Sequence, residues 1–599
     1  MNVCCVALAQ NNNNKMLRDS LLQENTPSDE RFTAFYDSLK YREHKSWVIR
    51  MLTNWLIRDN DGKLPLSPEM ELERAQRYYD EFAGKIITKI DIIQANVFEN
   101  KDFTEETGVA KFINSLHILT KRRNIEKNLL FHIDNPLDPY TMVVNERLLR
   151  RLPYLAESFI LIAPNSDVPG TVAVTVFARD SWTIGVEADL SNHPWGKVFD
   201  ANFLGSGNEL SIRYYPKLNE QMNTLQIAYS LNNFLGTFAN VDASLGVGAI
   251  YNNIFVSAER PFILPSDHFF GLYAGNTQNR QSFSIIDTSL VINASDYSLW
   301  YGYSFNLGKR KGANLYLASS FDYRKFNKRP ETNAATNPYF HNKQSWLFSI
   351  GISQQNYFQG NMILGIGRIE DVPYGFNVDF TGGLRWDEYI GRRYYVGASA
   401  KWGNNTAIGY FGVGASATTF IDDSGTKSQG EFGSYLTYFS PLFKCFGFYA
   451  RNYLEINYTN GWNRLDGEKE RIVFSEFANV RGMRIPPDMM GLRRMTINFE
   501  TALFSPLSFY FFNFTSYIWA DVGWLGCEQN VFENPFYSAV GVGLNIRNER
   551  LIFNSLIVRL GVNISKPSQV GFNPLSIALR QRINMPDFTP TRPKATVFN

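Results

Sequence analysis

The sequence has few of the residues that metal sites and disulfide frameworks require. Its 599 residues include four cysteines and six histidines. Cys445 and Cys527 stand far from each other and from the cysteine pair near the N-terminus, so no disulfide framework is expected. No histidine stands at metal-ligand spacing from another. They are His44, His117, His132, His193, His268 and His341. We therefore expect no metal site and no cofactor.

The motifs of common enzyme classes are also missing. The chain contains no G-x-S-x-G elbow, no H-E-x-x-H pair and no Walker A loop. We predict that the protein is not an enzyme, and we name no catalytic residue. The formal net charge is only +2, and the basic runs "LGKRKG", "NKRP" and "KRRN" fit turns or a solvated helix face. A nucleic-acid partner is therefore not expected.

No apolar run suits a transmembrane helix. The most apolar window, residues 504–526, contains Pro506, Asn513 and Asp521, which a spanning helix of about 20 residues disfavours. Its Phe, Tyr and Trp residues favour strands instead. The chain is 15% aromatic and 19% charged, a mixture that fits strands with one apolar face and one polar face.

Alternating segments of roughly ten residues fill the chain from 181 to 564. In the segment 555–564, one face carries Leu556, Val558, Leu560, Val562 and Ile564. The other face carries Ile557, Arg559, Gly561 and Asn563. Glycines within such strands, Gly541, Gly543 and Gly561 among them, are interpreted as bends and as relief of crowding in a curved wall. So many alternating segments predict a transmembrane antiparallel β-barrel with apolar residues outward, at about 24 residues per strand and connection for about 16 strands.

Four further regions are predicted around this barrel. Residues 1–9 end in Ala7-Leu8-Ala9 and resemble the remnant of a signal peptide; a frayed terminus is the alternative, and a lipoprotein site at Cys4 or Cys5 is less favoured. Residues 10–83 have a helical rhythm. Residues 84–180 read as strand, helix, helix, strand, strand, which predicts an α+β domain. Residues 565–599 form a C-terminal tail beyond the last predicted strand.

Several segments resemble one known family. The segments are "NERLLRRLPYLAESFILIAP", "DANFLGSGNEL" and the series "NVRGMR", "TINFETALFSPL", "YIWADVGWLG" and "AVGVGLNIR". Together they resemble the BamA/TamA family of outer-membrane assembly factors, in its Bacteroidetes-like branch with a single POTRA domain. The resemblance spans roughly 84–564 and implies a POTRA domain at 84–180, a 16-stranded barrel at 181–564 and a bacterial outer-membrane location with the N-terminal region in the periplasm.

The resemblance also implies particular site residues. An early-barrel motif corresponds to Asn202, Phe203, Gly205 and Gly207. The arginine of the V-R-G motif at the tip of an inward-folded loop, here Arg481, is implied to pair with Asp521 on a neighbouring strand. Val480 and Gly482 flank that arginine, and Gly482 allows a tight turn.

Strand parity supports this lumenal loop lock independently. In "YIWADV", Tyr517, Trp519 and Asp521 share one face while aliphatic residues take the other, so Asp521 is predicted to point into the lumen. By the same parity Glu500 faces inward and is a second candidate acceptor for the guanidinium. The alternative is that Arg481 is a solvated loop residue and that Asp521 pairs elsewhere.

The function implied is insertion of client β-barrels into the outer membrane. A closing seam between strands near 182–190 and 555–564 is expected to accept client strands, and the POTRA sheet edge is expected to bind them by β-augmentation. The expected partners are unfolded outer-membrane proteins, outer-membrane lipid, and periplasmic or lipoprotein accessory subunits. Two alternatives stay open: an exporter of the two-partner-secretion type, and a barrel-anchored scaffold whose residues 10–83 bind a partner. A TonB-dependent receptor is disfavoured because no plug domain precedes the barrel.

The chain departs from the family pattern in three places. Met483 stands where an aromatic residue is common in the family, and only one POTRA domain is expected where full assembly factors have several. The tail 565–599 follows the last predicted strand, so the seam beside that strand is not necessarily free.

Overall fold

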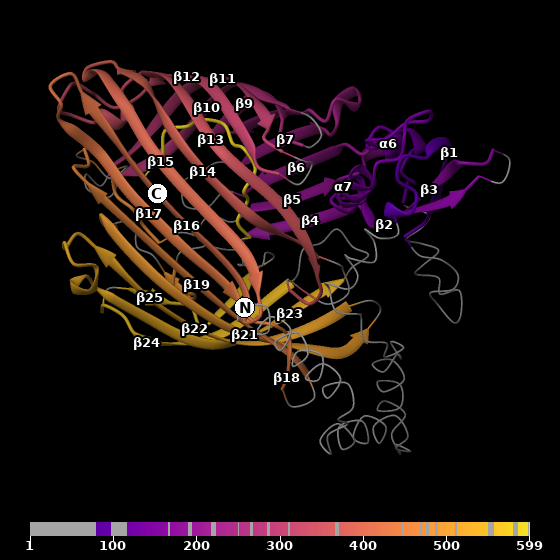
Figure 1. Ribbon diagram of the computed structural model, residues 1–599. Coiled ribbons are helices and arrows are strands. Elements are labelled where there is room, and N and C mark those ends of the chain that lie inside the picture. Colours follow the sequence, from indigo (N-terminus) through magenta and orange to yellow (C-terminus); the bar gives the residue numbers. More distant parts are fainter. Residues whose placement is uncertain are drawn as a thin grey trace, which may run out of the picture.

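The computed structural model contains a small α+β domain followed by a closed β-barrel (Figure 1). It describes residues 79–97 and 117–598 with internal gaps. The gaps are 166–167, 190–194, 217–222, 249–250, 264–266, 284–287, 309–311, 364, 366–369, 446–447, 466, 468–469, 475–478, 485–488, 510–511, 549–555, 569, 579–584 and 597. The predicted signal remnant 1–9 and nearly all of the predicted helical region 10–83 lie outside the described residues.

The described residues of the N-terminal domain form a three-stranded sheet with two helices. Its elements are β1 (Ile86–Ala95), α6 (Arg122–Glu126), α7 (Pro139–Arg150), β2 (Leu155–Pro164) and β3 (Thr171–Asp180). The sheet order is β1-β3-β2, with β1 parallel and β2 antiparallel to β3. The helix α7 begins at a proline, and the Asp138 carboxylate before it accepts a hydrogen bond of 3.1 Å from the backbone N–H of Thr141.

The barrel closes on itself and contains 21 strands among the described residues. They are β4 (Ile184–Asp189), β5 (Trp195–Asp200), β6 (Glu209–Tyr215), β7 (Thr224–Leu231), β8 (Asn240–Gly248), β9 (Tyr251–Arg260), β10 (His268–Phe283), β11 (Thr288–Asn306), β12 (Asn314–Lys328), β13 (Lys343–Gly360), β14 (Glu370–Asp387), β15 (Gly391–Thr406), β16 (Gly409–Asp422), β17 (Lys427–Phe439), β18 (Phe443–Cys445), β19 (Phe448–Trp462), β21 (Arg493–Phe509), β22 (Phe512–Gly526), β23 (Phe536–Asn548), β24 (Leu556–Ser565) and β26 (Leu575–Ala578). A separate pair, β20 (Met483–Arg484) and β25 (Gly571–Phe572), forms a two-stranded sheet. We call the barrel end where β3 leads into β4 the proximal end, and the other end the distal end.

The mainly β fold and the closed barrel are confirmed, but the predicted number of about 16 strands is too low. The estimate assumed about 24 residues for each strand and its connection. Many connections are short turns, for example 388–390 between β14 and β15 and 407–408 between β15 and β16, so they add little to the length of their strands. Strands β4 to β8 are also short, at six to nine residues each. More strands therefore fit into the same length of chain.

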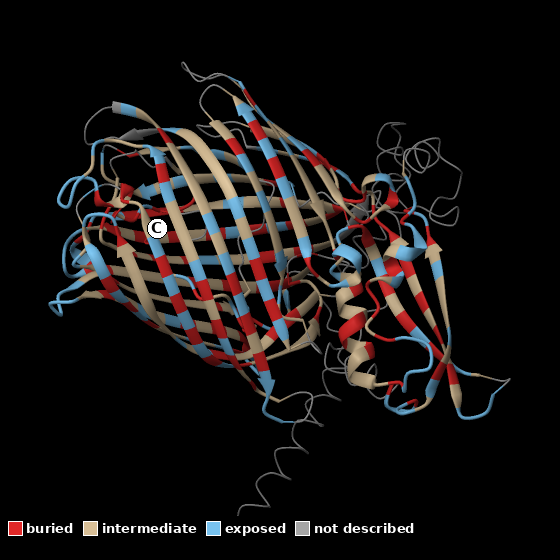
Figure 2. Cartoon of the chain, turned by 90° about the horizontal axis from the view of Figure 1, so that it is seen from above, coloured by how far each residue is buried: buried red, intermediate tan, exposed pale blue. Residues whose placement is uncertain are grey.

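The outer wall of the barrel is rich in aliphatic side chains. On β24, Leu560, Val562 and Ile564 are 55%, 62% and 66% exposed, whereas Ile557 is buried. This is the face that alternation predicts to be outward. Exposed and buried residues alternate along neighbouring strands of the barrel wall (Figure 2). Among the described residues, no helix has both the length and the apolar character needed to cross a membrane.

The predicted seam and tail need correction. The seam was expected between the strands near 182–190 and 555–564, with 565–599 lying beyond the barrel. In the structure β26, which belongs to the tail, lies between β24 and β4 and completes the wall. The described residues of 585–598, all but residue 597, then run inside the barrel (Figure 1). The error arises because "LSIA" is too short to register as a periodic strand.

Candidate functional site

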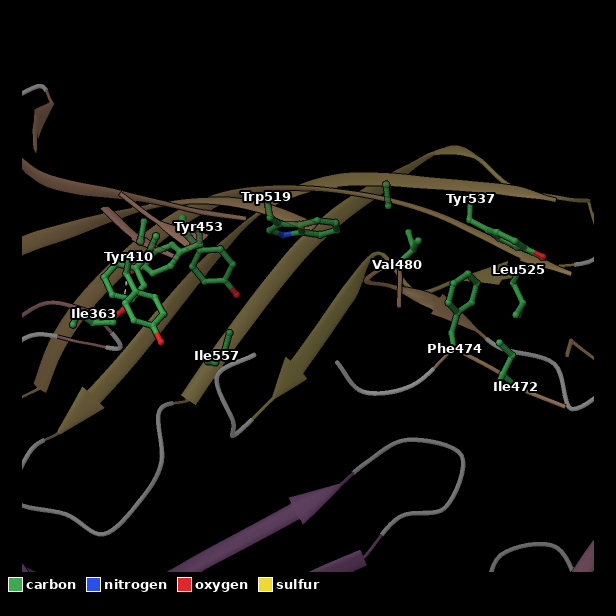
Figure 3. Close-up of a cluster of buried hydrophobic side chains, with 14 of the residues drawn as sticks. Ile363, Tyr410, Tyr453, Ile472, Phe474, Val480, Trp519, Leu525, Tyr537 and Ile557 are labelled. Atoms are coloured by element: carbon green, nitrogen blue, oxygen red, sulfur yellow. Dashed lines mark hydrogen bonds between the residues drawn. The ribbon is translucent and has the colours of Figure 1, made fainter. Parts of the chain in front are cut away.

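The loop between β19 and β21 folds into the lumen and packs there. Val480 is 1% exposed, and the loop residue Phe474 contacts Tyr537 of β23 edge to face, with ring centroids 5.2 Å apart. These residues belong to a cluster of buried hydrophobic side chains. In Figure 3, Val480 and Phe474 lie on the loop side of the cluster, and Trp519 lies on the wall side. A Cβ added to Gly523 would lie 3.0 Å from a methyl group of Val480, so this glycine makes room for the loop tip.

At the loop tip, Arg481 binds two carboxylates. Its Nε donates to Oδ2 of Asp521 and its Nη2 to Oδ1, each over 2.8 Å, which is a bidentate pair. Its Nη1 donates to Oε2 of Glu500 over 2.6 Å. Its backbone N–H also donates to Asp521 over 2.8 Å. The structure therefore brings together the three charged residues of the predicted lumenal loop lock.

The wall residues of this cluster come from paired strands. Glu500 of β21 lies opposite Trp519 of β22, and Asn498 lies opposite Asp521. These residues share the lumenal face because side chains alternate along each strand. The guanidinium carbon of Arg481 lies 4.6 Å from the centre of the Trp519 ring, a cation–π distance. One cation thus meets two carboxylates and an aromatic face in a largely buried site.

Gly482 and the tail hold the loop tip from the other side. Gly482 has a φ of +80°, and an added Cβ would come within 2.6 Å of the Phe572 ring. Its carbonyl oxygen accepts a hydrogen bond of 2.7 Å from the backbone N–H of Asn573, and β20 pairs with β25 immediately beside it. The sequence does not predict this contact between the tail and the loop. The two segments are about 90 residues apart, and no local pattern in either one indicates the pairing.

The early-barrel motif forms a tight turn between β5 and β6 that contacts the N-terminal domain. Asn202 accepts a hydrogen bond of 2.7 Å from the backbone N–H of Gly207 and donates one of 2.9 Å to Thr120. The carbonyl oxygen of Gly205 accepts from the backbone N–H of Lys121 over 2.9 Å. A Cβ on Gly205 would lie 2.6 Å from the carbonyl oxygen of Leu119, and this close approach requires glycine. Phe203, the fourth residue of the motif, begins the single 3-10 turn between these contacts.

No family model matches the sequence, and no curated protein matches it either. Solved structures similar to the chain include BamA from Haemophilus ducreyi lacking POTRA domains 1–3 and CdiB from Acinetobacter baumannii. The BamA structure is 10% identical and has a TM-score of 0.39, covering 89% of this chain and 97% of that chain. The CdiB structure is also 10% identical and has a TM-score of 0.40, covering 92% and 98%.

Part of the early-barrel motif occurs a second time in the chain, and this repeat was not among the predicted site residues. "NFLG" occurs at 202–205 and again at 233–236, in the turn between β7 and β8. Leu204 and Leu235 have left-handed φ values of 55° and 54° in the two turns. In the second turn, Asn233 donates to the carbonyl oxygen of Lys127 over 2.8 Å and to Asn128 over 3.0 Å. The internal repeat was the signal that could have identified this docking site.

Helix α7 contacts the barrel at a different turn. Arg150 binds Asp371 of β14 through both carboxylate oxygens, with a shortest distance of 2.9 Å, and its guanidinium also binds Glu146 over 2.6 Å. Burial disfavours the charged form of Arg150, but the charges of Asp371 and Glu146 outweigh it and raise the pKa of this guanidinium. The guanidinium of Arg147 stacks 3.7 Å from the Tyr357 ring. The N-terminal domain is therefore fastened to two separate parts of the proximal end.

We expect replacement of Asn233 by alanine to loosen this docking. The change removes two donated hydrogen bonds and places alanine in the left-handed conformation that Asn233 adopts at φ 48°. Together these cost about 2 kcal/mol, so trypsin should cleave at 121–127 about 30-fold faster in the detergent-solubilised protein. Asn405→Ala, at an exposed asparagine on the proximal part of β15, is the control. Equal cleavage in both variants would contradict a docking role for the second motif.

None of the described residues forms a group of three His, Cys, Asp or Glu side chains that could hold a metal ion. The lumenal cluster at Arg481 offers charge pairing and hydrogen bonds rather than a nucleophile or a general base. Its chemistry is that of a latch between a loop and a wall.

Proposed function

We propose that this protein is an outer-membrane assembly factor that inserts client β-barrels, of the single-POTRA type that the sequence resembles. Three features support this: a closed barrel with an aliphatic outer wall, a small α+β domain docked at one end, and a loop latched inside the lumen by Arg481. The proximal end then faces the periplasm. The clients are unfolded outer-membrane proteins, the surroundings are outer-membrane lipid, and periplasmic or lipoprotein subunits act as accessories.

The observation that carries the proposal is the short pairing at the seam. Among the described residues, β26 pairs with β24 through four residue pairs, from Ile557↔Ala578 to Leu560↔Leu575. On its other edge β24 pairs with β23 through nine residue pairs. Backbone pairing is the main force that holds strands in a barrel wall within lipid, so the wall is expected to open where the fewest pairs must break. A client strand would add to the edge exposed there.

The N-terminal sheet offers a second place for strand addition. Its edge strands are β1 and β2. On β1, the backbone of Ile87 already bonds to Asp134 and Asn135 over 2.8 and 3.1 Å. On β2, the Tyr79 hydroxyl donates to the carbonyl oxygen of Ile160 over 3.0 Å. We therefore place client binding on β1 beyond Ile87, where it would precede transfer to the seam.

Contacts inside the lumen favour insertion over export. The turn after β13 bends inward, where Arg451 donates to the carbonyl oxygens of Met362 and Asn361 over 3.1 and 3.2 Å. Tyr453 donates to the carbonyl oxygen of Ile363 over 2.5 Å. The tail segment 585–598 occupies the lumen beyond that turn. An exporter would have to clear both segments from the whole length of its path, whereas an insertase that opens sideways can keep the inward turn after β13 in place.

Client insertion by the purified protein tests the proposal. A small outer-membrane barrel protein, diluted from urea, is added to liposomes that contain this protein, and folding is followed by protection from protease. We expect faster folding than in empty liposomes, because the seam supplies a paired edge in the membrane. Liposomes that carry an unrelated barrel of similar size are the matched control. Equal folding rates in the three preparations would overturn the assembly function.

A further inference from the structure

The tail follows a path through the wall and then into the lumen. After β24 it turns inward, and β25 pairs with β20 of the loop. The carbonyl oxygen of Pro574 accepts a hydrogen bond of 2.8 Å from the backbone N–H of Gly561, and β26 then returns antiparallel along β24. Its outward residues Leu575 and Ile577 are 54% and 59% exposed, as on the neighbouring strands. Thus four tail residues imitate a strand of the wall.

β26 is much shorter than the edge on which it lies. β24 has ten residues, and the described part of β26 pairs with only four of them, from Ile557 to Leu560, in the half of β24 towards the proximal end. A transmembrane strand of about ten residues would pair with the full length of β24. Because unpaired backbone groups are costly in lipid, a longer strand would bind this edge better than β26 does. The present occupant can therefore be displaced by an incoming strand.

The lumen wall is shaped to receive the rest of the tail. Three tail rings lie against glycines on different strands. A Cβ on Gly403 of β15 would lie 2.6 Å from the Phe588 ring, and one on Gly461 of β19 would lie 2.3 Å from the Phe598 ring. A Cβ on Gly412 of β16 would lie 2.8 Å from the Pro586 ring. Any larger residue at these positions would displace the tail, so the wall and the tail fit each other.

The contacts of the lumenal segment are made largely by side chains of the wall. Asn377 donates to the carbonyl oxygens of Phe588 and Thr589 over 3.2 and 3.1 Å. Ser320 donates to the carbonyl oxygen of Pro593 over 2.8 Å. Three prolines, Pro586, Pro590 and Pro593, lack the N–H that a strand ladder needs. The segment can therefore leave the lumen without breaking any strand pairing of the barrel.

We propose that the edge of β24 and the lumenal seats, the wall positions at Gly403, Gly412 and Gly461, form a docking surface for an extended client segment. The described tail residues, 575–578 and those from 585 onward, occupy this surface at rest. The incoming partner is an unfolded chain whose aliphatic residues alternate, as Leu575 and Ile577 do in β26. It takes the edge from β26, and the lumenal segment leaves its seats as the barrel opens. This inference rests on the proposed assembly function. It adds that the protein's own tail occupies the binding site of the client at rest.

A disulfide across the seam tests the displacement. Arg559 of β24 and Ser576 of β26 lie directly opposite each other, a spacing that a disulfide can bridge. Both are replaced by cysteine after Cys4, Cys5, Cys445 and Cys527 are replaced by serine. We expect the oxidised protein to lose client insertion in liposomes and the reductant to restore it. The matched control is Ala398→Cys with Ala417→Cys, an opposite pair joining β15 to β16, for which oxidation should change nothing.

Each outcome decides between the two proposals. If the oxidised seam variant inserts clients as fast as its reduced form, β26 is not displaced and the inference is wrong. If neither form accelerates insertion, the proposed assembly function is wrong. Whether the tail blocks the lumen is then tested by ion conductance. Deletion of 585–599 should raise single-channel conductance in a planar bilayer, because the lumen loses its filling. Unchanged conductance would show that this segment does not block the lumen.

Discussion

Replacing Asp521 with arginine should deplete the folded protein from the outer membrane, and reversing Arg481 as well should restore only part of it. The single change places two guanidinium groups in a site where Arg481 is 6% and Asp521 is 1% exposed. Breaking one partner of a buried ion pair costs about 3–5 kcal/mol, and like-charge contact adds to that. The loop would leave the lumen, and the latch would be lost.

The double reversal is incomplete because of Glu500. An aspartate at position 481 would stand beside this carboxylate, which now lies 2.6 Å from the guanidinium. Two carboxylates at so short a distance repel each other. The double reversal therefore replaces the repulsion between two guanidinium groups with a repulsion between two carboxylates. Adding Glu500→Gln to the double reversal should therefore recover more folded barrel than the double reversal alone. The amount of folded barrel should therefore rise from the single to the double to the triple variant. This order follows from contacts among three residues and would not be expected for an isolated pair.

Outer-membrane levels and heat stability measure the effect. Folded barrel is followed as the band that migrates faster on a gel before heating, for this protein and for other outer-membrane barrels in the same cells. Arg392→Asp is the control, since it breaks an exposed ion pair with Asp423 at the distal end, and exposed pairs contribute little. If Asp521→Arg behaves like this control, the contact at Arg481 has no role as a latch.

Replacing Gly482 with alanine should be the second most damaging change. At φ +80° a residue with a Cβ is strained by about 1–2 kcal/mol. The added carbon would also lie 2.6 Å from the Phe572 ring and 3.0 Å from the carbonyl oxygen of Asn573, and such overpacking costs about 1–3 kcal/mol more. The pairing of β20 with β25 would be lost, and with it the link between the loop and the tail.

Gly425→Ala separates the two costs. Gly425 lies in the turn between β16 and β17 at φ +83°, and nothing lies within 4 Å of its added Cβ. Both variants carry similar backbone strain, but only the change at Gly482 meets Phe572. The temperature at which the faster-migrating band of folded barrel disappears should therefore fall more for Gly482→Ala than for Gly425→Ala. Equal falls would mean that backbone strain alone explains the loss, and that the tail contact at Gly482 is unimportant.

Local patterns were enough to predict the wall and the direction of its side chains. The alternation of 555–564 placed Leu560, Val562 and Ile564 outward, where the structure has them exposed. The interpretation of Gly541 and Gly543 as relief of crowding also agrees with the structure, since an added Cβ would meet the rings of Trp519 and Tyr517 within 2.5 and 2.2 Å. Parity along one strand is a local property, so one sequence suffices to read it.

The placement of Arg481 needed the family motif as well as parity. Parity turned Asp521 and Glu500 inward, but it did not select their cation among the many arginines of the loops. The motif selected Arg481, and the structure pairs it with both carboxylates. The part that this latch plays in assembly stays a prediction, as do the absence of an enzyme activity and the identity of the partners.

The sequence by itself determined that this chain folds as a barrel, which faces of its strands look outward, and which residues were candidates for the latch. Only the tertiary structure decided the number of strands, the place of β26 in the seam, the course of 585–598 through the lumen and the docking of the two "NFLG" turns. The reason is physical. Alternation and turn chemistry act between neighbours in the chain, whereas closure of the barrel and the seating of a proline-rich tail depend on contacts between residues hundreds of positions apart.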